Sequence, residues 1–171
     1  GASLEDFLAA PEAGLNLVLS PLTGPLAADM QRSFGTRAIN LHNAYDPVEI
    51  DTLMSDMGKH LNINFDKAFE NEREEVLTLQ EQAEQHLRGL RYVGAHTGPL
   101  NILPVATYLA NFGMEPMVLH LEEYWPDDKN QVAALKAKGY DPLVCHMVCS
   151  EADAPLLEQL SPDLCLGDLP G

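Results

Sequence analysis

Apolar runs and helical stretches alternate along this chain of 171 residues. The first run, "LNLVLS" over 15–20, is apolar and stops abruptly at Ser, Pro, Thr and Gly, as a buried strand does at its tip. The stretch 24–34 repeats apolar residues at helical spacing, and Gly35 is expected to end that helix. The same rhythm predicts further strands over about 37–42, 91–96, 117–121, 143–148 and 163–167, and helices before Gly113, before Gly139 and after Ser150.

Two helices interrupt this alternation. Asp46 is a natural N-cap, Pro47 suits the first helical position, and an apolar stripe runs from there to Leu61. The stretch 66–88 is rich in Glu and Gln, which predicts a partly exposed linking helix whose acidic run is a solvated face.

Strands that alternate with helices of this length are typical of βαβ units and of a parallel sheet covered on both faces. We therefore expect an α/β fold with a Rossmann-like parallel sheet. The expected domains are a first, partial βαβ lobe over 1–65, a linking helix over 66–89 and a second Rossmann-like lobe over 90–171.

The charge balance excludes several partners. Ten Lys and Arg stand against 26 Asp and Glu, a formal net charge of −16. Such a surface repels nucleic-acid phosphates and anionic membranes but is compatible with metals or cationic partners. No apolar run approaches the roughly 20 residues of a membrane span, and no signal peptide is visible. Three late cysteines form no disulfide framework, so a reducing, cytoplasmic setting is expected; the start without Met favours a piece of a longer protein.

In open parallel sheets, ligands bind beyond the carboxyl ends of the strands. The residues at those ends are therefore the cavity-lining or ligand-binding candidates: Ser20, His42, His96, Thr97, Gly98, Asn101, His120 and Glu122. We expect Ser20, His42, His96 and His120 to share one crevice, where they could bind a metal, a tetrapyrrole or an anion; solvated loop histidines are an equal alternative.

Each candidate also has a plainer interpretation. The amides of "AHTGPLN" (95–101) could hold an anion at a helix N-terminus, but a tight turn is favoured. His120, Glu122 and Glu123 could ligate a metal, although solvated side chains are favoured at such a tip.

The cysteines give little support to a metal centre. Cys145 and Cys149 would face the same side of a strand about 13 Å apart, too far to share one ion. We interpret them as small core residues. The chain has no CxxC and no GxSxG motif, so we expect no bound metal and no nucleophile triad in it.

A series of segments carries a resemblance to a known family. "LNLVLS" is followed by a helix, an extended segment and a capped helix, then by "REEVLTLQEQAEQHLRGLRYVGAH", "YLANFGMEPMVL" and "LSPDLCLGDLPG". In order and spacing these resemble the central portion of a subunit of the nitrogenase component 1 family, notably the nitrogenase α-subunit and related nitrogenase-like proteins. The family joint "LG-x-E-x-V" corresponds to "FGMEPM" (112–117), and "KPDL-x-x-G" corresponds to "SPDLCLG" (161–167).

The resemblance implies a nitrogenase component 1-like fold and identifies two departures. In nitrogenase α-subunits the strand matching 15–20 ends in the Cys that ligates the catalytic cofactor, whereas this chain has Ser20. A neutral hydroxyl is a poor replacement for a thiolate on iron. The loop matching 98–104 carries Arg in nitrogenase, but here Asn101 and Leu103. Both departures imply that this chain does not hold the nitrogenase cofactor.

Three functions remain open on these grounds. The first is a domain of a nitrogenase-like oxidoreductase subunit, which pairs with a homologous subunit and accepts electrons from an ATP-dependent iron–sulfur reductase to reduce a bound substrate. Such a fragment is expected to be inactive alone and to hold no cofactor, with an iron–sulfur cluster possible in the full-length protein. The second is a non-catalytic cofactor-assembly or carrier protein of the same family, and the third is a doubly wound module that binds a small molecule or metal.

Overall fold

The computed structural model describes residues 3–65, 67, 69–95, 100–146 and 150–167, the last range without the side chains of 150–152. The chain divides into two compact units, Gly1–Arg73 and Glu74–Gly171. The elements that begin in the first unit are α1 (Leu4–Leu8), η1 (Ala10–Glu12), β1 (Leu15–Val18), η2 (Pro21–Thr23), α2 (Gly24–Phe34), β2 (Arg37–Asn40), α3 (Pro47–Leu61) and α4 (Glu70–Leu87).

In the first unit, β1 and β2 pair in parallel, with Leu15 opposite Arg37 and Val18 opposite Asn40. The helix α2 makes the crossover and ends at Gly35, whose φ of +75° is the left-handed conformation that the sequence predicted for this stop. Both strands stop earlier than predicted. After β1, Ser20 caps η2, and Pro21 has no amide hydrogen with which to continue a ladder.

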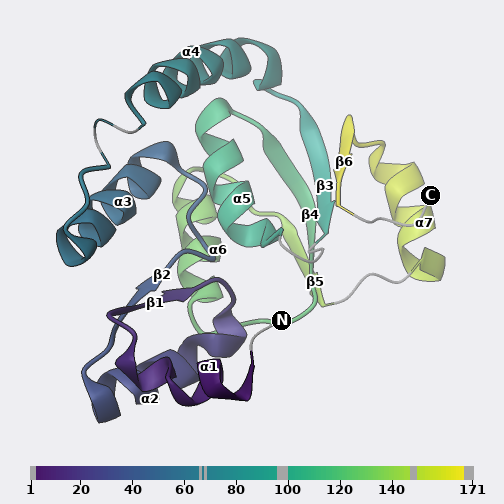
Figure 1. Cartoon of the computed structure of the whole chain (residues 1–171). Coiled ribbons are helices and arrows are strands. Elements are labelled where there is room, and N and C mark those ends of the chain that lie inside the picture. The colour runs from purple at the N-terminus through teal and green to yellow at the C-terminus, as the bar shows by residue number, and fades with distance from the viewer. Residues whose placement is uncertain (1–2, 66, 68, 96–99, 147–149, 168–171) are drawn as a thin grey trace. The chain divides into compact units, whose positions relative to one another are not determined.

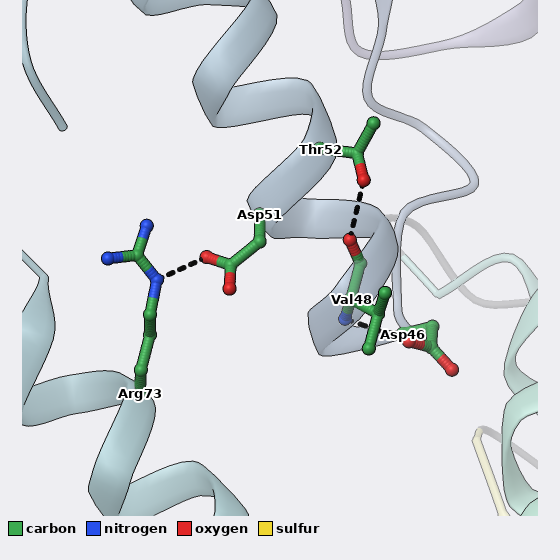
Figure 2. A network of polar contacts seen from close by, with 5 residues as sticks. All are labelled: Asp46, Val48, Asp51, Thr52 and Arg73. Atoms are coloured by element: carbon green, nitrogen blue, oxygen red, sulfur yellow. Dashed lines mark hydrogen bonds and ion pairs between the residues drawn. The ribbon is translucent and has the colours of Figure 1, made fainter. Parts of the chain in front are cut away.

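The predicted cap of α3 is confirmed. The Val48 amide donates to Asp46 Oδ1 at 2.8 Å, and the Thr52 hydroxyl donates to the Val48 carbonyl at 2.9 Å (Figure 2). One turn further on, Asp51 accepts from Arg73 Nε at 2.6 Å, which ties the start of α4 to α3 within this unit (Figure 2). Capping and the ion pair together fix the direction of a helix that buries only Gly58.

The second unit contains the end of α4 and a four-stranded sheet. Its elements are β3 (Arg91–Ala95), α5 (Ile102–Leu109), η3 (Ala110–Phe112), β4 (Glu115–Leu121), α6 (Asp128–Ala137), β5 (Leu143–His146), α7 (Ser150–Leu160) and β6 (Leu164–Leu166). The strand order is β5-β4-β3-β6 and every pairing is parallel. The helices α5 and α6 lie on one side of this sheet and α7 on the other (Figure 1). The expected α/β fold with Rossmann-like parallel βαβ units is therefore confirmed.

The core of the second unit is built on the two central strands. Val93, Ala95, Val118 and Leu119 are all buried on β3 and β4. The face that carries Leu119 packs against α5, where a Cβ added to Gly94 would lie 2.5 Å from Ile102 Cδ1. Glycine is therefore required at this position for the close approach of helix and strand.

The helix α4 has no buried residue, in agreement with a partly exposed linking helix. The boundary between the compact units falls inside it, after Arg73. The lobe limits expected from the sequence, 1–65 and 90–171, stay a prediction. Within the described ranges, no helix is both long enough and apolar enough to cross a membrane.

One buried polar group in this core gives a first testable prediction. Tyr92 on β3 is 0% exposed, and its hydroxyl has no hydrogen-bond partner among the described residues. Burial, and to a lesser degree the nearby Tyr140, raises the pKa of the phenol. Because an unpaired buried hydroxyl costs about 1–3 kcal/mol, Tyr92→Phe should raise the free energy of unfolding by roughly 1 kcal/mol.

Urea denaturation followed by circular dichroism measures this change. Tyr140→Phe is the matched control, since Tyr140 is only half-buried, and it should leave the midpoint close to that of the unmodified chain. A loss of stability in Tyr92→Phe would mean that the hydroxyl is paired.

Candidate functional site

Two of the predicted site residues lie in the first unit. Ser20 and His42 each follow one strand of the β1–β2 pair by two residues, so both stand at its carboxyl edge. The pairing continues past the strands, since the Leu41 amide donates to the Val18 carbonyl at 2.9 Å. The structure therefore brings these two candidates to the same edge.

Ser20 has a clear local role. Its Oγ accepts from the Leu22 amide at 3.4 Å, and its carbonyl accepts from the Thr23 hydroxyl at 2.8 Å. These bonds cap η2 and turn the chain from β1 into α2. His42 is half-buried, and its Nδ1 has no hydrogen-bond partner within the described residues.

Three other candidates, His96, Thr97 and Gly98, lie outside the described residues. Asn101 immediately precedes α5, is half-buried, and its carbonyl accepts from the Val105 amide at 3.3 Å. Glu122 follows the last residue of β4 and is exposed. A crevice shared by Ser20, His42 and the histidines of the second unit would need residues from both compact units. It stays a prediction.

His120 differs from its expected setting. The predicted polar strand tip would leave it solvated, but β4 continues through Leu121, and His120 is 2% exposed. The favoured interpretation of a solvated side chain is therefore wrong for this histidine. Its Nε2 lies 3.9 Å from Oδ1 of Asp153, which comes from α7 and is itself 7% exposed.

The sequence analysis missed Asp153, although a signal was present. Leu156, Leu157 and Leu160 form the apolar stripe of α7, and position 153 continues that stripe at helical spacing with a carboxylate instead of an apolar side chain. A charge on the buried stripe of a helix requires a polar partner on the surface beneath it. Among the described residues, His120 is one polar neighbour on that surface, with its Nε2 3.9 Å from Oδ1 of Asp153.

Cys145 lies beside this pair. It is opposite His120 in the β4–β5 register, so both side chains leave the sheet on the same face. Partial burial, and secondarily the Asp153 carboxylate, raises the pKa of the Cys145 thiol. A raised pKa keeps the sulfur protonated near neutral pH, and this argues against a nucleophilic role.

This influence of Asp153 on the thiol can be measured. With the carboxylate removed in Asp153→Asn, the thiol pKa should fall, so Cys145 should be alkylated several-fold faster at pH 7.5, where the thiolate is the reactive species. Iodoacetamide labelling in a Cys149→Ser, Cys165→Ser background reports Cys145 alone. Glu158→Gln removes an exposed carboxylate from the same helix and should not change the rate. An unchanged rate in Asp153→Asn would contradict this prediction.

A shallow cavity of about 330 Å³ lies at the carboxyl ends of β4 and β5. Its lining is mainly apolar: Leu121, Tyr124, Val132, Val144, Cys145 and His146. Among the residues that the structure describes, no three His, Cys, Asp or Glu side chains are grouped so that they could hold a metal ion. The expectation that this chain binds no metal or cofactor stays a prediction.

Parallel βαβ units with candidate polar residues at the carboxyl ends define a doubly wound, Rossmann-like protein. The model of the nitrogenase component 1 type oxidoreductase family matches residues 1–171. The chain therefore belongs to this family, as the resemblance indicated.

Solved structures agree on the fold. A nitrogenase Cp1 structure at pH 6.5 matches 96% of this chain with a TM-score of 0.78 and 16% identity. A second, nitrogenase Cp1 at pH 5, matches 98% with a TM-score of 0.65 and 19% identity. The chain spans 36% and 40% of the lengths of those two chains. No curated protein matches it.

Proposed function

We propose that this chain forms part of the substrate cavity in a nitrogenase component 1-like oxidoreductase subunit that does not carry the nitrogenase cofactor. In the full-length protein, a homologous nitrogenase-like subunit would be the partner, and an ATP-dependent iron–sulfur reductase would supply electrons. The chain alone would be inactive. An iron–sulfur cluster, if the protein has one, would be held by residues outside it.

The observation that carries this proposal is the state of Ser20. By the resemblance it stands where nitrogenase α-subunits have the cofactor Cys, and in the structure its hydroxyl and carbonyl both take part in capping η2. A side chain used in this way supports the turn at the carboxyl edge, while a hydroxyl offers iron a weak ligand. The half-buried His42 at the same edge would give the proposed cavity a polar group.

The test uses the full-length protein co-purified with its companion subunit. Addition of the reductase and ATP should cause ATP-dependent consumption of dithionite, and Ser20→Ala should retain the iron content of the unmodified protein. Iron lost in Ser20→Ala would show that Ser20 is a ligand and would overturn the cofactor part of the proposal. Bound cofactor without any ATP-dependent electron flow would favour the assembly or carrier function instead.

A further inference from the structure

We propose that the cavity at the carboxyl ends of β4 and β5 binds a small organic cation, an amine whose apolar body is about the size of one aromatic ring. This inference concerns the second unit alone and does not depend on the proposed function. The cavity has a volume of about 330 Å³. This is near the lower end of the roughly 300–1,000 Å³ that is usual for small-molecule sites, so a ligand with a single ring fits it.

The apolar walls of the cavity come from consecutive elements of one βαβ unit. Leu121 is the last residue of β4, Val144 lies on β5, and Val132 lies on α6, which connects the two strands. Their aliphatic side chains offer an apolar surface to the body of a ligand, and the removal of that surface from water favours binding. The cavity also lies at the edge where doubly wound sheets bind ligands.

One aromatic residue of the lining is suited to a positive charge. Tyr124 lies in the loop between β4 and α6 and is 48% exposed. The face of a tyrosine ring attracts an ammonium group that is placed over it. The backbone of this loop is held at the next residue, because the Trp125 amide donates to Oδ2 of the buried Asp128 at 2.6 Å. The ring is therefore presented by an anchored loop.

The charges around the cavity favour a cation over an anion. Glu122 and Glu123 are exposed and lie in the sequence between the lining residues Leu121 and Tyr124. The segment 121–130 contains four acidic residues and one basic residue: Glu122, Glu123, Asp127, Asp128 and Lys129. Burial raises the pKa of the Cys145 thiol, a further lining group, so its sulfur stays neutral near pH 7. Apolar walls beside a negative loop concentrate cations and repel carboxylates and phosphates.

The fluorescence of Trp125 provides a direct test, because it is the one tryptophan of the sequence and follows Tyr124. The 171-residue chain is titrated with 2-phenylethylamine, with the neutral 2-phenylethanol and with the anionic phenylacetate. The titrations are run at pH 8, since a protonated imidazole on the lining residue His146 would oppose a cation.

We expect a saturable change with 2-phenylethylamine, which should bind at least about five-fold more tightly than 2-phenylethanol because of the contact between its ammonium group and the ring. Phenylacetate should bind more weakly than either. The proposal would be overturned if the amine gave no saturable change, or if its affinity did not exceed that of the alcohol and of phenylacetate.

Three variants locate the ligand. Tyr124→Phe keeps the aromatic face and should keep the affinity for the amine within about two-fold, whereas Tyr124→Leu should weaken it at least about five-fold and leave the affinity for the alcohol close to its original value. Val144→Phe narrows the cavity and should weaken the binding of both probes. Circular dichroism checks that each variant is folded. Amine binding that is unchanged in Tyr124→Leu, or in a folded Val144→Phe, would place the ligand outside this cavity, and the proposal would be rejected.

Discussion

His120→Leu is expected to lower the free energy of unfolding by about 1–3 kcal/mol, because it removes a buried polar neighbour whose Nε2 lies 3.9 Å from Oδ1 of the buried Asp153. Leucine has a similar volume and fits a strand position that is 2% exposed, so little of the loss would come from packing. Urea denaturation at pH 7, followed by circular dichroism, measures the change.

The double variant His120→Leu, Asp153→Leu separates the pair from its surroundings. Two leucines at these positions would extend the apolar stripe of α7 onto an apolar strand, so the double variant should recover most of the loss and could exceed the original stability. A double variant as unstable as His120→Leu alone would mean that the loss does not arise from the carboxylate of Asp153. Recovery would show that the pair is retained for a purpose other than stability.

The sequence predicted the framework of the fold because local signals and tertiary packing agree there. Asp46 caps α3 and Gly35 ends α2, and both depend only on neighbouring residues. The parallel sheet followed from the alternation of apolar runs with helices. These features need no knowledge of which strand lies beside which.

The candidate site was harder to predict because it depends on long-range contacts. The strand length decided the setting of His120: β4 extends one residue past it, so the side chain is covered instead of solvated. Its partner Asp153 is 33 residues away along the chain and is brought to it only by the β5–α7 crossover. Periodicity places a residue on a face, but it does not identify the side chain on the opposite surface.

At Ser20, the sequence and the structure supply different information. The resemblance predicts that it replaces a ligand, and the structure places its oxygen atoms in the cap of η2. Membership of the nitrogenase component 1 type oxidoreductase family sets the fold, while the residues at the strand tips set the chemistry available there. Function in such folds is determined by the residues at the carboxyl edge, not by the sheet.

The second large effect is expected at Gly94 in the centre of β3. A Cβ there would lie 2.5 Å from Cδ1 and 2.7 Å from Cγ1 of Ile102, and 3.4 Å from Leu119 Cδ2. Ile102 is fully buried and cannot move aside freely, so Gly94→Ala should cost about 2–3 kcal/mol, near the upper end for overpacking. Gly24→Ala is a suitable control, because a Cβ at Gly24 meets nothing within 4 Å.

A double-mutant cycle distinguishes a steric cause from a general loss of strand propensity. Ile102→Ala alone should cost about 2–5 kcal/mol, because it leaves a cavity under α5. In the double variant, Ile102→Ala removes both isoleucine atoms that would clash with the new Cβ. The stability loss of the double variant should therefore be smaller than the sum of the two single losses by about 1 kcal/mol or more. Strictly additive losses, measured by urea denaturation, would contradict the close contact between α5 and β3. A large coupling would establish that this contact holds α5, and with it Asn101, at the carboxyl edge of the sheet.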